Sequence, residues 1–146
     1  MESTEVLLER RQEGRQVWAQ RVYHDGRVED YRDRDLVVEE GNFVEHKIAL
    51  KWRPSTILRP EEVNELIQAL HSSGFFDLPE EIGDSSEYFD APVFTWTVNL
   101  EDRQKTVIVV GPDATHNPAI KLLRELLTEL TAAGYRRDFA LKHRKV

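Results

Sequence analysis

The carboxylates with the clearest chemical potential lie in an acidic stretch, Asp84-Ser-Ser-Glu-Tyr-Phe-Asp90. Oxygen ligands of this kind suit Ca²⁺, and they could also serve a small metal-dependent hydrolase. The stretch lacks the Asp-x-Asp-x-Asp-Gly spacing of a calcium loop, so no metal site is predicted. A long polar connection is most often simply solvated, but long loops also carry function. If this loop binds a protein partner, the candidate residues are Asp84, Glu87, Tyr88 and Asp90.

The sequence lacks the usual local signatures of catalysis. It contains no Gly-x-Ser-x-Gly elbow, Walker loop, Gly-x-Gly-x-x-Gly or His-Glu-x-x-His. Without cysteine it can form neither disulfides nor a thiolate nucleophile. No two of the five histidines have the short spacing that would let one helix or strand chelate a metal. We therefore expect no catalytic residue, no metal and no cofactor.

Charge is distributed unevenly along the chain. Lys and Arg total 20 against 27 Asp and Glu, a net charge of -7, yet residues 136–146 carry +4 and the remainder -11. An acidic body repels polyanions, so binding to nucleic acid or a membrane surface would have to rest on the tail alone. A solvated terminus is the simpler interpretation, and nucleic-acid binding is not expected. The basic tail residues are Arg136, Arg137, Lys142, Arg144 and Lys145.

Length and composition favour one folded domain. A chain of 146 residues with 40% hydrophobic and 9% aromatic residues can bury a sizeable core. Apolar runs such as 106–110 fall far short of the roughly 20 residues that span a bilayer, so no membrane insertion is expected. The first residues, Met-Glu-Ser-Thr-Glu, do not resemble a secretion signal. A cytoplasmic location is expected.

The first half of the chain predicts a meander of strands. Residues 5–12 could be strand or helix, and a strand is favoured. Asp25-Gly26 predicts a tight type I′ turn between strands at 16–23 and 28–31, with positive φ at Gly26. Further strands are predicted at 36–38 and 43–52, and Pro54 is expected to end the second of them.

Two helices and two further strands follow. Pro60 is expected to open a helix that Ser73-Gly74 ends, and Asn117-Pro118 to open a second that Gly134 ends. Between them, 93–100 and 105–110 alternate as paired strands. The prediction is an α+β domain over residues 1–134, with an antiparallel sheet of about five to six strands and both helices on one face. Residues 135–146 form the basic tail.

The predicted core combines two helical stripes with the apolar faces of several strands. Its members are Trp18, Val22, Val63, Leu66, Ile67, Leu70, Phe76, Phe94, Trp96, Val98, Ile108, Val110, Ile120, Leu123, Leu127 and Leu130.

A resemblance rests on the Asp25-Gly26 hairpin, the helix start Leu58-Arg-Pro-Glu-Glu62, and Gly74-Phe-Phe-Asp-Leu-Pro79, followed by an apolar strand pair and a Leu-rich helix. Over roughly residues 5–132 the chain resembles the emfourin type of small bacterial protein. These are single-domain inhibitors of thermolysin-like metalloproteases. The stretch Asp33 to Pro54 and the basic tail have no counterpart in that pattern, and no binding residue carries over.

The function expected is therefore a non-enzymatic protein-binding module, with inhibition of a thermolysin-like metalloprotease as its sharpest form. Two alternatives remain open. One is a small metal-dependent hydrolase that uses the 80–90 loop, and the other is a nucleic-acid or membrane-surface accessory protein that uses the basic tail.

Overall fold

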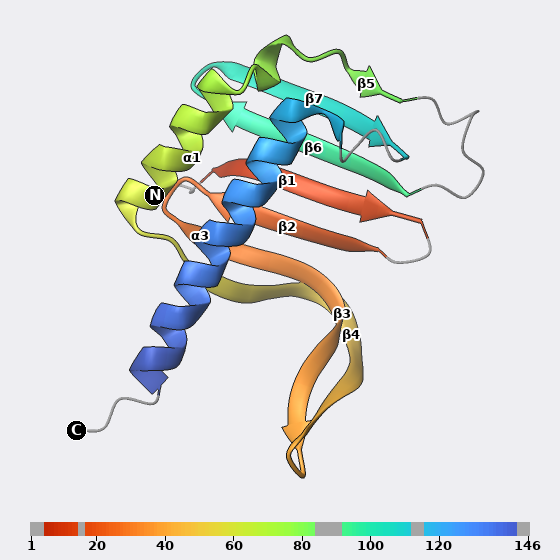
Figure 1. Cartoon of the computed structure of the whole chain (residues 1–146), viewed down its shortest axis with the longest axis vertical. Coiled ribbons are helices and arrows are strands. Elements are labelled where there is room, and N and C mark those ends of the chain that lie inside the picture. The colour runs from red at the N-terminus through yellow and green to blue at the C-terminus, as the bar shows by residue number, and fades with distance from the viewer. Residues whose placement is uncertain (1–4, 15–16, 84–91, 112–115, 143–146) are drawn as a thin grey trace.

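A computed structural model describes residues 5–14, 17–83, 92–111 and 116–142. Helices and strands follow the order expected of an α+β domain (Figure 1). The elements are β1 (Val6–Glu13), β2 (Trp18–Tyr23), β3 (Arg27–Glu39), β4 (Asn42–Ile57), α1 (Pro60–Ser72), the 3₁₀ turn η1 (Phe75–Asp77), β5 (Glu81–Ile82), β6 (Val93–Leu100), β7 (Arg103–Val110) and α3 (Pro118–Lys142).

The strands form one seven-stranded sheet in the order β4-β3-β2-β1-β6-β7-β5. The α+β class is confirmed, whereas the antiparallel sheet of five to six strands needs correction. β5 pairs with β7 in parallel, which makes the sheet mixed. With only two residues, β5 has no periodic pattern from which a sequence could predict a strand. The favoured strand at 5–12 is confirmed as β1, which pairs with both β2 and β6.

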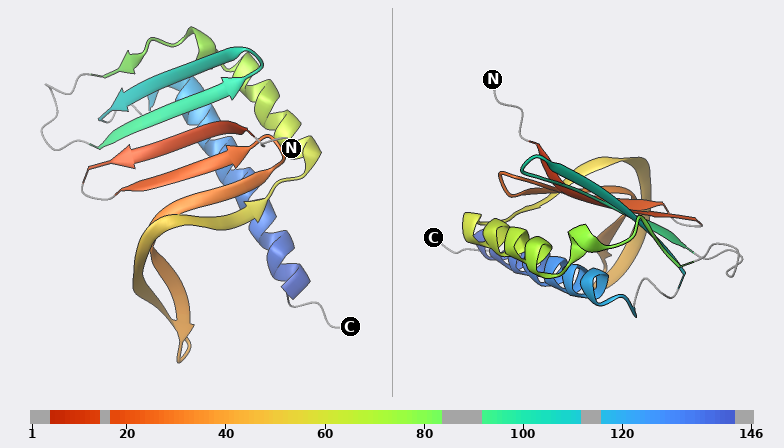
Figure 2. Two further views of the ribbon diagram at one scale, coloured as in Figure 1. Left: turned by 180° about the vertical axis from the view of Figure 1, so that it is seen from behind. Right: turned by 90° about the horizontal axis from the view of Figure 1, so that it is seen from above.

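Both helices cover the same face of the sheet (Figure 2), and the core lies between these two layers. Leu66, Leu123 and Leu127 are completely buried against the strands. Ile108 was predicted in the core but is 38% exposed, while its neighbours Val107 and Val109 are buried. The reason is that Ile108 points to the face without helices. None of the helices in the described part of the chain is long and apolar enough to cross a membrane.

The turn between β2 and β3 is confirmed, and Gly26 has a φ of 97°. Asp25 does not share the positive φ that a type I′ turn needs, and the Gly26 amide donates to the Tyr23 carbonyl at 2.9 Å. A Cβ at Gly26 would stand 2.3 Å from the Leu58 carbonyl oxygen. Glycine is therefore required here both by its φ and by the close approach of the chain before α1.

The helix starts follow the sequence, but the end of α3 does not. Pro60 begins α1, and the Asn117 side chain accepts hydrogen bonds from the amides of Ala119 and Ile120 at 3.1 Å. Gly134, expected to end the last helix, lies inside α3, which continues to Lys142. It serves packing instead, because a Cβ at Gly134 would stand 2.4 Å from the Thr56 hydroxyl oxygen.

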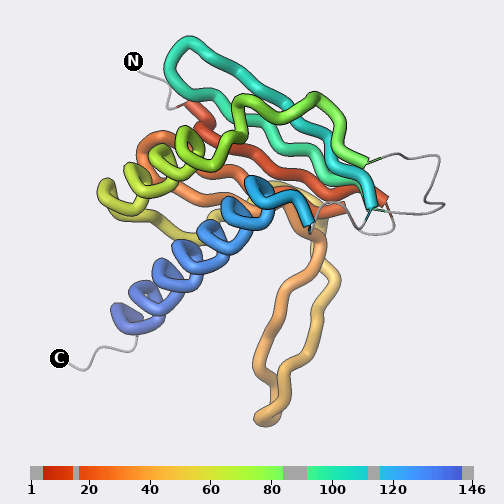
Figure 3. The backbone as a smooth tube through the Cα atoms, turned by 45° about the horizontal axis from the view of Figure 1, so that its top comes forward, coloured from red at the N-terminus to blue at the C-terminus, as the bar shows by residue number. Residues whose placement is uncertain are grey.

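β4 also continues beyond its predicted end at Pro54 and reaches Ile57. Pro54 stands opposite Glu29 at a register shift, and β4 is an edge strand of the sheet. An edge strand tolerates proline because one side of its backbone has no strand to pair with. The paired strands β3 and β4 therefore form a ribbon that extends well past the other strands (Figure 3).

Candidate functional site

The distal part of the β3–β4 ribbon, residues 33–50, projects from the domain and is called the arm here. The register shifts between Arg32 and Arg34, where the ribbon bends. Residues 43–52 alternate like a strand with one side on a core, but Leu50 is exposed and Phe43 is 74% exposed. Apolar and polar residues do alternate along this strand, yet none of the described helices covers this part of the ribbon. A two-stranded hairpin is marginal in water without such cover.

Three apolar side chains share one face of the arm. Leu36 pairs with Glu45, and Val38 pairs with Phe43. Directly paired residues of an antiparallel ladder point to the same side, and alternate residues of a strand return to it. Leu36, Val38 and Phe43 therefore form one strip, and all three are more than 60% exposed. Glu45 shares this face and lines a pocket at the base of the arm.

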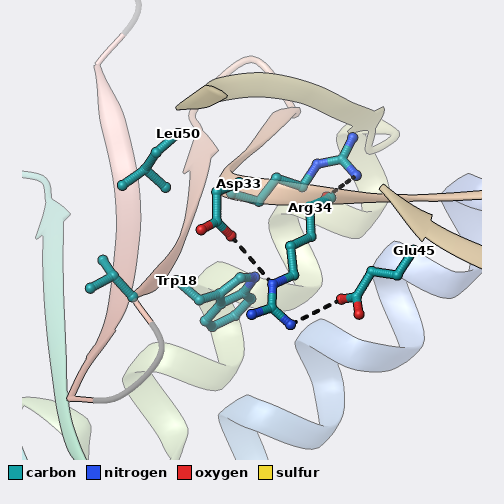
Figure 4. Close-up of a pocket in the computed structure, with 7 residues that line it drawn as sticks. Trp18, Asp33, Arg34, Glu45 and Leu50 are labelled. Atoms are coloured by element: carbon teal, nitrogen blue, oxygen red, sulfur yellow. Dashed lines mark hydrogen bonds and ion pairs between the residues drawn. The ribbon is translucent and has the colours of Figure 1, made fainter. Parts of the chain in front are cut away.

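The pocket at the base of the arm has a volume of about 410 Å³ and is shown in Figure 4. Both apolar and charged side chains line it. Arg32 donates to Asp35 at 2.9 Å, and Arg34 lies 3.3 Å from Glu45. The lining residues are Val17, Trp18, Arg32, Asp33, Arg34, Glu45 and Leu50. The arginines are matched by carboxylates, so the pocket suits a side chain with apolar surface better than a free anion.

A polar row crosses the helix-covered face beside this pocket. Arg10 pairs with Gln20, Gln20 with Asp30, and Asp30 with Arg53 across four neighbouring strands. Arg10 Nε donates to Gln20 Oε1 at 2.9 Å, and its guanidinium lies 4.9 Å from the centre of the Trp18 ring. Burial lowers the pKa of Arg10 to about 10, although the nearby Asp30 carboxylate opposes that effect. Arg10 thus stays charged and braces the tryptophan of the pocket.

Asp30 is incompletely satisfied, as is Arg53, whose Nε atom lacks a hydrogen-bond partner among the described residues. Burial raises the pKa of Asp30 above the ordinary range, against a hydrogen bond from Ser55 and the charges of Arg32 and Arg10. Its Oδ1 atom has no hydrogen-bond partner among the described residues. An imperfectly paired, half-buried carboxylate costs folding free energy, so the base of the arm is not optimised for stability alone.

The opposite face of the sheet carries none of the helices in the described residues and is held by aromatic and charged contacts. The Arg21 guanidinium lies 3.8 Å from the centre of the Trp52 ring and donates to Glu9 at 2.7 Å. Tyr31 packs on Trp52 with ring centres 5.2 Å apart. These contacts satisfy the arginine within the fold, so they do not create a cationic surface for a polyanion.

The residues expected to bind a partner in the acidic loop, Asp84, Glu87, Tyr88 and Asp90, lie outside the described residues. So do Arg144 and Lys145 of the tail. Arg136, Arg137 and Lys142 belong to α3, and Arg137 binds Glu62 of α1 at 2.6 Å. Sequence reasoning missed the arm and its pocket, although the insertion 33–54 had marked the right stretch. The sequence signal that could have revealed the arm is the alternating strand predicted at 43–52, which charged residues flank.

Neither a protein-family model nor a curated protein matches this sequence. Within the described ranges, no three His, Asp or Glu side chains are grouped so that they could hold a metal ion. The arm and its pocket are therefore the features of the fold that point to a function.

Proposed function

We propose that this protein is a non-catalytic protein-binding module and that the arm, with the pocket at its base, is the binding element. The observation that carries this proposal is the strip of Leu36, Val38 and Phe43 on one face of the arm, each more than 60% exposed. Scattered exposed apolar residues are ordinary, but a grouped strip on a projecting element is typical of an interaction surface. Inhibition of a thermolysin-like protease is one specific form of this function.

A photo-crosslinking amino acid placed at position 43 tests the proposal in living cells. Position 108 provides the matched control, because Ile108 is also an exposed apolar strand residue but lies on the open face of the sheet. We expect a protein adduct from position 43 and none from position 108, as measured by gel shift and mass spectrometry. Adducts from both positions, or none from position 43, would contradict the proposal.

The inhibitor form has its own assay. Purified protein is titrated against thermolysin, and the native chain is compared with the Phe43→Lys variant. Stoichiometric inhibition that is lost in the variant would support the inhibitor form. Absence of inhibition would remove that form and leave the crosslinking result to decide whether the arm binds another protein.

A further inference from the structure

The last two turns of α3 provide a second projecting surface. Tyr135 and Asp138 contact β4, because the Tyr135 hydroxyl bonds Ser55 at 2.5 Å and Thr56 donates to Asp138 at 2.8 Å. β4 is an edge strand, so the residues that follow extend past the sheet. Phe139, one turn beyond Tyr135 on the same helix face, is 63% exposed. Lys142 continues this face at the end of the helix.

The arm and this helix end carry opposite charge. In the arm, two cations and five carboxylates give a net charge of -3, whereas Arg136, Arg137 and Lys142 against Asp138 give the helix end +2. The carboxylates of the arm are Asp33, Asp35, Glu39, Glu40 and Glu45. Both surfaces also present exposed apolar side chains, Phe43 on the arm and Phe139 on the helix. Each surface thus has the charge and the apolar character that the other one needs.

Their placement in the molecule is as informative as their charge. In Figure 1 the arm and the end of α3 both extend toward the bottom, with the helix on the left and the arm on the right. A second copy can be rotated by 180° about the viewing axis and placed below the first. Its arm and helix end then point upward, with the arm on the left and the helix end on the right. The arm of each copy then meets the helix end of the other, and the two contacts are identical, as a two-fold interface requires.

We infer that the partner of the arm is a second copy of this chain, in a two-fold dimer in which the arm of each copy packs on residues 135–142 of the other. This inference rests on the proposed function and names its partner. Leu36, Val38 and Phe43 cover the Phe139 region, while the net negative charge of the arm attracts the basic end of α3. Two such contacts form at once, so each one strengthens the other.

Two variants test the exchange through complementary defects. Phe43→Lys gives the arm a positive charge against a basic helix end, and Phe139→Glu gives the helix a negative charge against an acidic arm. Each variant alone damages both contacts of its homodimer. A mixed dimer has one native contact and one contact between Lys and Glu. We expect the native chain to sediment at twice 17.0 kDa, either variant alone to be monomeric, and their mixture to recover the dimer.

Matched controls separate loss of the interface from loss of the fold. Leu122→Glu places the same charge on an exposed apolar position of α3, and Ile108→Lys does so on the open sheet face. Both should remain dimeric, and circular dichroism should show native melting for all four variants. Loss of the dimer in high salt is also expected, because the contact pairs opposite charges.

Three results would overturn the inference: a native chain that is monomeric at every concentration, variants that still dimerise, or a mixture that stays monomeric. These outcomes are distinguishable from failure of the proposed function. A monomeric chain that crosslinks to a different protein from position 43 keeps the arm as a binding element and rejects only the second copy. An adduct of twice the chain mass supports both.

Discussion

At the scale of single residues, Gly134 was expected to end the last helix, but it lies inside α3 and is required there by packing against Thr56. Alanine is a better helix former by about 1 kcal/mol, so Gly134→Ala should stabilise an isolated helix. In the folded chain the new Cβ would stand 2.4 Å from Thr56 Oγ1 and 2.8 Å from Thr56 Cγ2. Thr56 is buried and bonded to Asp138, so it cannot move without cost.

We therefore predict that Gly134→Ala lowers the free energy of unfolding by about 1–3 kcal/mol, as overpacking typically does. Denaturant unfolding measures this change. Thr56→Ala removes the atoms that would be closest, so the double variant should be more stable than the sum of the two single changes predicts. Simple additivity would mean that contact with Thr56 is not the cause.

Asp30 yields a prediction about pH. Its raised pKa means that the folded chain holds the proton more tightly than the unfolded chain. Stability from this group is therefore present below its ordinary pKa and is lost as pH rises through the folded value. Asp30→Asn removes this dependence, so the variant should gain stability relative to the native chain as pH rises from below the ordinary carboxyl pKa through the folded value. Denaturant midpoints measured across this range would contradict the prediction if the difference stayed constant or reversed.

At the scale of elements, Glu62 and Arg137 join the two helices. Arg137 donates to both carboxylate oxygens, at 2.6 and 3.2 Å, and also to the Ile57 carbonyl at 3.1 Å. The same carboxylate accepts the Arg59 amide at 2.8 Å, which completes the start of α1. Burial acts to raise the pKa of Glu62, but these hydrogen bonds outweigh it and the pKa lies below its ordinary value.

We predict that Glu62→Gln costs about 1 kcal/mol at neutral pH, since a bidentate, partly buried ion pair exceeds a typical surface pair. Stability from a lowered carboxyl pKa is present above the ordinary value and is lost as pH falls through the folded value. The cost should therefore shrink in acid. Glu61→Gln controls for the charge at the helix start, because Glu61 lies in the same first turn and is exposed. Equal costs for the two variants would reject the pairing argument.

At the scale of the whole molecule, the arm is separable from the core. None of its residues belongs to the buried cluster between the sheet and the helices. Arg32 and Lys51 are directly paired at its base, so an Asn-Gly turn can close the ribbon there.

We predict that replacing residues 33–50 with Asn-Gly changes the free energy of unfolding by no more than about 1 kcal/mol and abolishes dimerisation. Leu66→Ala is the contrasting variant. It empties a fully buried position and should cost about 2–5 kcal/mol. Thermal and denaturant unfolding with sedimentation would measure both effects. An armless chain that fails to fold would show that the arm belongs to the folding unit.

The amino-acid sequence by itself determined the local features whose cause is local. Asp25-Gly26 marked a turn, Pro60 and Asn117 marked helix starts, and the stripe through Leu123 and Leu127 marked a buried helix face. Each of these depends on φ, a cap or a period that neighbouring residues impose. The α+β class follows from their order.

Only the tertiary structure decided which alternating faces are covered. Ile108 and Phe43 both lie in strands with the pattern of half-buried strands. The helices lie on the opposite side of the sheet from Ile108, and they do not reach the arm that carries Phe43. The role of Gly134 likewise depends on Thr56, which is far away in the sequence. The arm and the end of α3 come to the same edge of the molecule because β4 lies at a sheet edge and α3 contacts it, and no local pattern encodes that placement.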